Sequence, residues 1–316
     1  MNADRHVFCV AGGWRWQCWL LCLFLLLARP AWAWNAAGHR LVAAIAWDQL
    51  DDPTRAELSR LLQAHPDYAH WIRRAMGSDV NRTAFIESSA WPDDIRKDKR
   101  FYDIDHDQAT SLVPGFPDME RHRDGHFVNR PLDGWQLGQK VVSGQIDQQL
   151  VILATVLSAR DAARSEQTYA LPWLIHLVGD AHQPLHAATE PSVAEAPGKP
   201  PSIVNPFNPR KPRSTLHAFW DDLPGPLWLR GEDLDAASAA LIARYPPPLP
   251  STSAQWIDES WLIARNSAYP PDVGKTPTIS AEFMERSREI ANRRVAEAGY
   301  RLADLLRERL LKRSAD

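Results

Sequence analysis

The densest cluster of chemically active side chains lies in the apolar stretch Leu171–Ala187, which holds three histidines and one aspartate. His176 and Asp180 are four residues apart, so on a helix their side chains would share one face and could reach one metal ion. We expect the helical pattern to fail at Pro184, which would let His186 approach the same place from another direction. The stretch therefore predicts part of a metal site.

A second pair with the same four-residue spacing, His217 and Asp221, follows further along the chain. Imidazole nitrogens and carboxylate oxygens together form a ligand set typical of zinc. One such pair would be weak evidence, because a histidine on an apolar helix face is more often a satisfied core residue. Two pairs and a third histidine favour the metal site.

The first 33 residues have the pattern of a secretory signal peptide. Arginines precede the apolar run Trp19–Ala28, and Ala31-Trp32-Ala33 has the small residues of a cleavage site. Ten apolar residues are too few to span a bilayer, so removal is favoured over a permanent membrane anchor. Cleavage after Ala33 would place the protein in a periplasm or outside the cell, and all three cysteines would leave with the signal.

Cleavage would also change the charge of the protein. The signal holds three arginines and one aspartate, so the net side-chain charge moves from −3 for the whole chain to −5, with histidines neutral. This acidic balance argues against a nucleic-acid binder with a generally basic surface. It does not exclude one whose positive charge is carried by bound ions.

Four more residues could ligate a metal if the fold brings them to the two pairs. Trp34 would do so through its backbone, since a free terminal amine and the carbonyl of the same residue can chelate one ion. That option exists only if the mature chain begins at Trp34. At three to four ligands per ion, with one shared carboxylate, the candidates suffice for three zinc ions. The nine candidate ligand residues are Trp34, His39, Asp93, His126, His176, Asp180, His186, His217 and Asp221.

We expect residues 34–316 to form a single, mainly α-helical domain, because apolar residues recur at helical spacing along most of them. No strand, internal repeat or linker stands out. Phe101–Pro131 predicts a long irregular segment, and the proline-rich residues 189–213 predict an exposed loop. One predicted helix carries His176 and Asp180 and is called the metal helix. A second contains Leu41–Trp47, and a third opens at Asp52-Pro53. Further helices are predicted at Val80–Ala90, Gln145–Ala159, Glu232–Tyr245, Ala254–Ala268 and Ser280–Arg313.

Several motifs resemble the zinc-dependent single-strand-specific nucleases of the S-one and P-one type, which are relatives of the bacterial zinc phospholipases C. That family begins its mature chain with tryptophan, as Trp34 would here. The matching motifs stand in family order. They are Ser89-Ala90-Trp91-Pro92-Asp93, His126-Phe127-Val128-Asn129, the stretch Gly179–His186 and the stretch Leu216–Asp221.

The resemblance implies the mainly helical fold of these enzymes and a division of the ligands among three zinc ions. Asp93, His126, His176 and Asp180 would hold one ion. Trp34, His39 and again Asp180 would hold a second, and His186, His217 and Asp221 a third. His182 would not be a ligand.

The resemblance also implies roles towards the substrate. Arg96 would contact the scissile phosphate, so Asp93, Arg96 and Asp180 are the predicted catalytic residues. Phe127 would stack on a bound base and Asn129 would hydrogen-bond it. One departure concerns the nucleotide pocket: the Gly-Gly-Asn stretch common in the family is missing, and the proline-rich loop occupies that interval.

We therefore expect that the exported protein, processed to begin at Trp34, is a monomeric zinc phosphodiesterase with 3′-nucleotidase activity. Its partners would be single-stranded DNA and RNA, which it would cleave to 5′-phosphate ends, and 3′-nucleotides. The alternative is a phospholipase C-like zinc hydrolase of phospholipid headgroups. A third interpretation is an exported binding protein that zinc only stabilises.

A prediction about processing follows from the role of Trp34. A form with extra residues attached ahead of Trp34 lacks the free amine and should lack a complete metal pair around Asp180. Zinc content and turnover of this form, compared with the processed protein, measure the effect. Normal turnover of the extended form would contradict the chelate.

Overall fold

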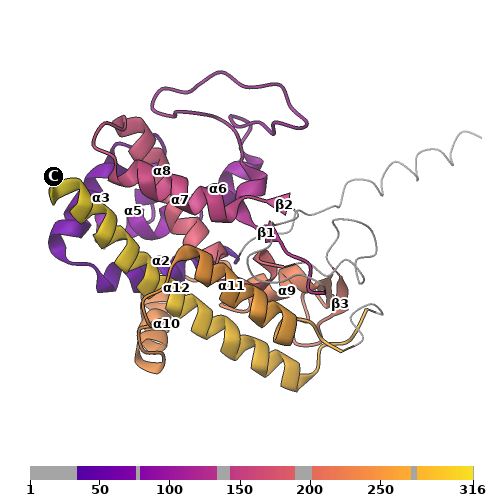
Figure 1. Cartoon of the computed structure of the whole chain (residues 1–316). Coiled ribbons are helices and arrows are strands. Elements are labelled where there is room, and N and C mark those ends of the chain that lie inside the picture. Colours follow the sequence, from indigo (N-terminus) through magenta and orange to yellow (C-terminus); the bar gives the residue numbers. More distant parts are fainter. Residues whose placement is uncertain (1–33, 76–78, 134–142, 189–200, 272–275, 316) are drawn as a thin grey trace, which may run out of the picture. The chain divides into compact units, whose positions relative to one another are not determined.

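The structure is a computed structural model that describes residues 34–75, 79–133, 143–188, 201–271 and 276–315 (Figure 1). The predicted signal peptide, residues 1–33, lies outside the described residues, as does the first part of the proline-rich segment, residues 189–200. Among the residues that are described, no helix is both long and apolar enough to cross a membrane.

The prediction of a mainly α-helical domain is confirmed, and the described residues belong to one compact unit. The α-helices are α2 (Ala36–Gln49), α3 (Asp52–Gln63), α4 (Tyr68–Ile72), α5 (Val80–Ser88), α6 (Trp91–Asp94), α7 (Ile146–Ser158), α8 (Arg164–Asp180), α9 (Leu216–Asp222), α10 (Gly231–Arg244), α11 (Ser253–Ile263) and α12 (Ala281–Ala315). Short 3-10 turns are η1 (Ile95–Lys97), η2 (Arg123–His126) and η3 (Pro184–His186), and η5 (Ala264–Ala268) is a π-helical turn after α11.

Polar side chains set where several of these helices begin. The side chain of Asn35 accepts hydrogen bonds from the backbone of Ala37 and Gly38 and so caps α2. Asp51 caps α3 through a 2.8 Å bond from the Thr54 amide, and the helix begins at Asp52, where the sequence predicted it to open. These caps satisfy backbone donors that the first turn of a helix leaves without partners.

Helices α2 and α8 lie at the centre of the core. Helix α12, the long yellow helix in Figure 1, packs along α2, and α7 packs along α8. Gly299 of α12 allows the close approach, because a methyl group there would lie 2.5 Å from a methyl carbon of Ile45. Burial of α2 on several sides explains why ten of its residues from Gly38 to Trp47 are buried, including the polar His39 and Arg40.

The expectation that no strand is present was wrong. Strand β1 (Val128–Asn129) pairs antiparallel with β2 (Ser143–Gly144), and β3 (Ser202–Val204) pairs antiparallel with β4 (Arg213–Thr215). Strands of two or three residues are too short to show the alternation of apolar and polar residues that reveals a strand.

The prediction of an exposed loop at 189–213 was also partly wrong. Its described part contains β3 and the start of β4, and Ile203 in β3 is buried. The Val204 amide donates to the Pro277 carbonyl at 2.9 Å, which ties the hairpin to the segment before α12. The sequence did not indicate these strands, because the many prolines of the segment interrupt any apolar periodicity. The prolines do not prevent the pairing of β3 with β4.

The metal helix ends earlier than expected. Helix α8 stops at Asp180 and not at Pro184, and Gln183 adopts an extended backbone. A proline disfavours helical geometry in the residue before it, so the chain has already left the helix when it reaches Pro184. The resulting turn separates Asp180 from His186, so that their side chains approach the site from two directions.

Candidate metal centre

Three groups of histidine and aspartate side chains gather at the end of α8. Within each group, the candidate ligand atoms lie within 4.8 Å of one another. All of these residues are buried except His217, which is half-buried. The groups are His39, His176 and Asp180; Asp93, His126 and His176; and His186, His217 and Asp221.

Asp180 connects the first two groups. One of its carboxylate oxygens, Oδ2, lies 3.0 Å from Nδ1 of His126 and 3.2 Å from Nε2 of His176. The other oxygen, Oδ1, lies 3.4 Å from Nε2 of His39. A carboxylate whose two oxygens face different sets of nitrogens has the arrangement needed to bridge two ions.

Backbone carbonyls orient two of the histidine rings. His176 donates from Nδ1 to the carbonyl of Ser89 at 2.8 Å, which leaves its Nε2 facing Asp180. His186 donates from Nδ1 to the carbonyl of His126 at 2.6 Å, and its Nε2 lies 3.1 Å from Nε2 of His217. Hydrogen bonds of this kind hold the remaining ring nitrogen in place for a metal ion.

The amino-terminal segment reaches the centre because of a glycine on α8. A methyl group at Gly179 would lie 2.9 Å from Nδ1 of His39, so only glycine lets α2 approach this closely. Trp34 is fully buried beside these residues, and the next amide, that of Asn35, donates to the carbonyl of Asp221 at 3.1 Å. Trp34 thus lies near the first and third groups, as its predicted role requires, while that role stays a prediction.

Burial keeps most of the histidines neutral. It lowers the pKa of His39, His126 and His186 well below the usual histidine value. Burial would also lower the pKa of His176, but the carboxylates of Asp180 and Asp93 raise it instead. Neutral imidazoles have a lone pair available for a metal ion at physiological pH.

Burial outweighs the hydrogen-bond partners of two carboxylates in the centre. Burial raises the pKa of Asp180 to about 6 and raises that of Asp221 well above its usual range. Among the described residues, both ring nitrogens of His39, Oδ1 of Asp180 and Oδ2 of Asp221 are buried without a hydrogen bond. Buried polar atoms are rarely left in this state, and cations bound in the three groups would satisfy one nitrogen of His39 and both of these carboxylate oxygens. The donor set therefore fits a metal ion.

Arg96 lies beside this centre, where the sequence predicted it. It follows Asp93 by three residues through α6 and η1, and its Nε is 3.1 Å from Oδ1 of Asp93. Only 8% of the Arg96 side chain is exposed. Its charge contributes to the lowered pKa of His126, after the larger effect of burial.

The two predicted base-binding residues, Phe127 and Asn129, follow His126 and are half-buried. Gly144 packs against the carbonyl of Phe127 in a left-handed backbone conformation that favours glycine. The side-chain amide of Asn129 donates to Oγ of Ser143 at 2.7 Å. Asn129 would have to share or exchange this bond to hold a base, and its role stays a prediction.

Gln183 is a functional candidate that residue chemistry did not single out. Its side-chain amide donates to Oδ1 of Asp221 at 2.8 Å, and its side-chain oxygen accepts from the amide of Leu185 at 2.5 Å. The available signal was its position inside the motif from Gly179 to His186. Gln183 lies in the turn that follows Asp180, and its hydrogen bond holds Asp221, a candidate ligand of the third group.

The chain is similar to known nucleases. A family model described as S1/P1 Nuclease matches residues 34–311. Two curated relatives are proteins of Arabidopsis thaliana: Endonuclease 3, 27% identical over 215 residues, and Endonuclease 5, 24% identical over 213 residues. These alignments cover 67% and 65% of this chain and 62% and 61% of the relatives, so the chain spans less than two thirds of their length.

The shared position of Asp180 gives a prediction about pH and zinc. The Asp180 carboxyl has a pKa of about 6 in the folded, metal-free protein against an ordinary value of 3.8. Between these values the unfolded chain binds fewer protons, so the stability of the metal-free protein falls as the pH rises through this window. Asp180→Asn should therefore leave the melting temperature of the zinc-free protein at pH 8 equal or higher.

The same variant should lose zinc. We expect zinc affinity to fall by more than the roughly 10–100-fold that loss of an outer hydrogen-bonding partner costs. Thermal unfolding with and without added zinc measures both effects, with His39→Ala as the comparison because His39 belongs to one group only. A smaller loss of zinc binding from Asp180→Asn than from His39→Ala would contradict the bridge.

Proposed function

Because the chain belongs to the S1/P1 nuclease family, we propose that it is an exported zinc-dependent phosphodiesterase that cleaves single-stranded DNA and RNA. Family membership supports a nuclease that acts on nucleic acids. The proposal adds 5′-phosphate products, activity on 3′-nucleotides and three zinc ions. The observation that carries it is the buried carboxylate of Asp180, which faces histidines of two groups and has a third group nearby.

The proposed metal sites use the residues of the three groups. Asp93, His126, His176 and Asp180 would hold one zinc ion, Trp34, His39 and Asp180 a second, and His186, His217 and Asp221 a third. Bound zinc would supply Lewis acidity, which activates water at neutral pH and offsets the charge of a phosphate. This local positive charge would let an acidic protein attract a polyanion.

The chain's own residues would position the substrate. The guanidinium of Arg96 can donate two parallel hydrogen bonds to phosphate oxygens, which a lysine cannot reproduce. Phe127 is half-buried, and a base could stack on the part of its ring that remains exposed. Stacking of this kind contributes about 1–3 kcal/mol per base and requires an unpaired base, so it favours single strands over duplexes.

Export and processing are part of the proposal. The family match begins at residue 34, the residue that would become the amino terminus after cleavage behind Ala33. Burial of Trp34 beside His39 and Asp221 supports a terminal amine at that place. We propose that the processed protein acts as a monomer in a periplasm or outside the cell.

A substrate panel tests the function. The processed, zinc-loaded protein should cleave single-stranded DNA and RNA, act on 3′-nucleotides and leave phosphatidylcholine intact. A chelator should abolish turnover and added zinc should restore it. Lipid hydrolysis with inert nucleic acid would replace the proposal by a phospholipase C-like function, and absence of turnover on every phosphoester would leave only a zinc-stabilised binding protein.

A variant of Arg96 tests the phosphate contact. Arg96→Ala should lower kcat/KM on single-stranded DNA by about 10²–10³-fold, the usual cost of losing one donor to the transition state. Arg96→Lys should recover only part of this loss. Zinc content is the control and, because Arg96 also contacts the proposed ligand Asp93, it is measured at saturating zinc, where it should stay unchanged in both variants. Near-normal turnover of Arg96→Ala at full zinc content would remove Arg96 from the mechanism.

A further inference from the structure

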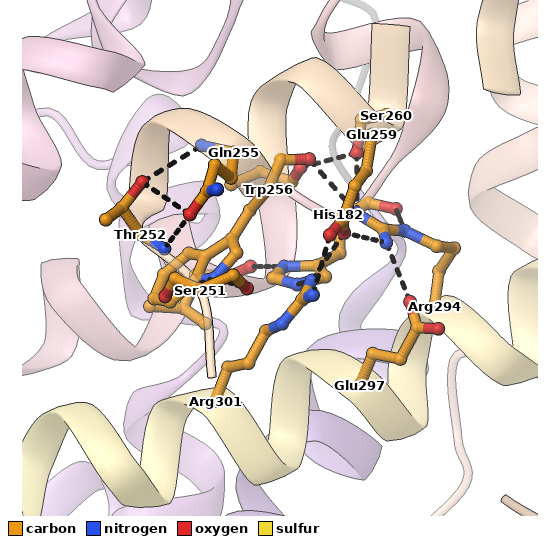
Figure 2. Close-up of polar contacts among 12 residues, drawn as sticks. His182, Ser251, Thr252, Gln255, Trp256, Glu259, Ser260, Arg294, Glu297 and Arg301 are labelled. Carbon is orange, nitrogen blue, oxygen red and sulfur yellow. Dashed lines mark hydrogen bonds and ion pairs between the residues drawn. The ribbon is translucent and has the colours of Figure 1, made fainter. Parts of the chain in front are cut away.

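The ring of His182 enters an ionic network formed with α11 and α12, in which the arginines are buried and Glu259 is partly exposed (Figure 2). His182 lies between Asp180 and His186 in sequence, but its ring makes different contacts. It donates from Nδ1 to the carbonyl of Val178 at 2.7 Å and accepts at Nε2 from Arg301 at 2.9 Å. Both ring nitrogens are thus occupied by protein groups, so His182 links the metal segment to α12.

Two arginines of α12 form the centre of this network. Arg301 donates both terminal nitrogens to the two oxygens of Glu259 on α11, at 2.7 and 2.8 Å. Arg294 donates to Glu259 at 2.7 Å and to Glu297 at 2.7 Å. Both arginines are buried, and together the two carboxylates balance their charge. Figure 2 shows Glu259 between the two guanidinium groups.

The same network holds the backbone immediately after Asp180. The hydroxyl of Ser260 donates to the carbonyl of Ala181 at 2.6 Å, and Nε of Arg294 donates to the carbonyl of His182 at 3.3 Å. These carbonyls follow the last turn of α8, where a helix leaves acceptors without partners. Cationic groups at a helix carboxyl terminus also interact favourably with the helix dipole.

From this turn the contacts continue to the third metal group. Gln183 is the next residue, and its amide holds Asp221. The carbonyl that closes the turn, that of Gln183, accepts from the amide of His186 at 3.0 Å. A shift of the backbone at residues 181–183 would therefore displace Asp180 on one side and His186 and Asp221 on the other.

We propose that Glu259, Arg294 and Arg301 are positioning residues that set the spacing between the Asp180 groups and the His186 group. The inference rests on the proposed metal-dependent function. None of the three is a candidate ligand, and they act only through the turn. Glu259 has a second effect, because without its charge two buried arginines would stand next to a site for cations with only Glu297 to balance them.

Zinc binding and a cobalt spectrum of the processed protein test the proposal. Glu259→Gln should lower zinc affinity, measured by competition with a chelating dye, by about 10–100-fold. The visible absorption of the cobalt-loaded variant should shift, since that spectrum reports ligand geometry. The matched control is Glu289→Gln, which removes another arginine–glutamate contact of α12, with Arg244 of α10, and should change neither readout.

Unfolding of the zinc-free protein separates positioning from a general loss of stability. Positioning predicts that Glu259→Gln reduces the rise in melting temperature caused by zinc. An equal drop of the zinc-free and zinc-loaded melting temperatures, with unchanged zinc affinity and cobalt spectrum, would overturn the proposal. Should Glu259→Gln not fold, Arg301→Met and Arg301→Lys take its place, with zinc affinity expected to fall in the first and to recover partly in the second.

These readouts do not depend on the substrate. A wild-type protein that binds zinc in the expected amount but cleaves no nucleic acid would defeat the proposed function and leave the positioning test intact. Conversely, an active nuclease whose Glu259→Gln variant binds zinc normally would defeat only the positioning role.

Discussion

The structure depends on the buried carboxylate of Asp180 and on the positive charge needed to stabilise it. Both of its oxygens face imidazole nitrogens, and its side chain is fully buried at the end of a core helix. Burial disfavours the charged form and raises the pKa of this carboxyl to about 6 when no cation is bound. Cations placed among the surrounding nitrogens would reverse this preference, and the neutral histidines are suited to hold them.

The fold can be understood as the set of elements that brings other ligands to this carboxylate. Helix α2 brings His39 through the gap left by Gly179, while α6 and η2 bring Asp93 and His126. Backbone carbonyls then orient the rings of His176 and His186. The network of α11 and α12 holds the backbone that follows Asp180. The amino-terminal and carboxyl-terminal helices, which pack on each other, thus both contribute to one centre.

Much of this arrangement could be predicted from the sequence. The helices have clear apolar periodicity, and most of their boundaries agree with the prediction within a few residues. The candidate ligands have rare combinations of residue type and spacing, such as His217 and Asp221, which α9 places four residues apart. The very short strands could not be predicted, because they depend on tertiary contacts. The end of α8 ahead of Pro184, by contrast, agrees with a local rule, because a proline disfavours helical geometry in the residue before it. Residue type also does not distinguish His182 from the candidate ligand histidines; only the direction of its side chain after α8 does. Arg294 and Arg301, seven residues apart on α12, share a helix face, yet nothing local connects them to α8.

The central claim is that Asp180 is shared between two metal ions of a three-ion centre. The most direct measurement is anomalous X-ray diffraction at the zinc edge from crystals of the protein that begins at Trp34. The account predicts three zinc peaks, one in each group of side chains, with the two oxygens of Asp180 directed at different ions. A single peak at the end of α8, or an Asp180 that contacts one ion only, would contradict it.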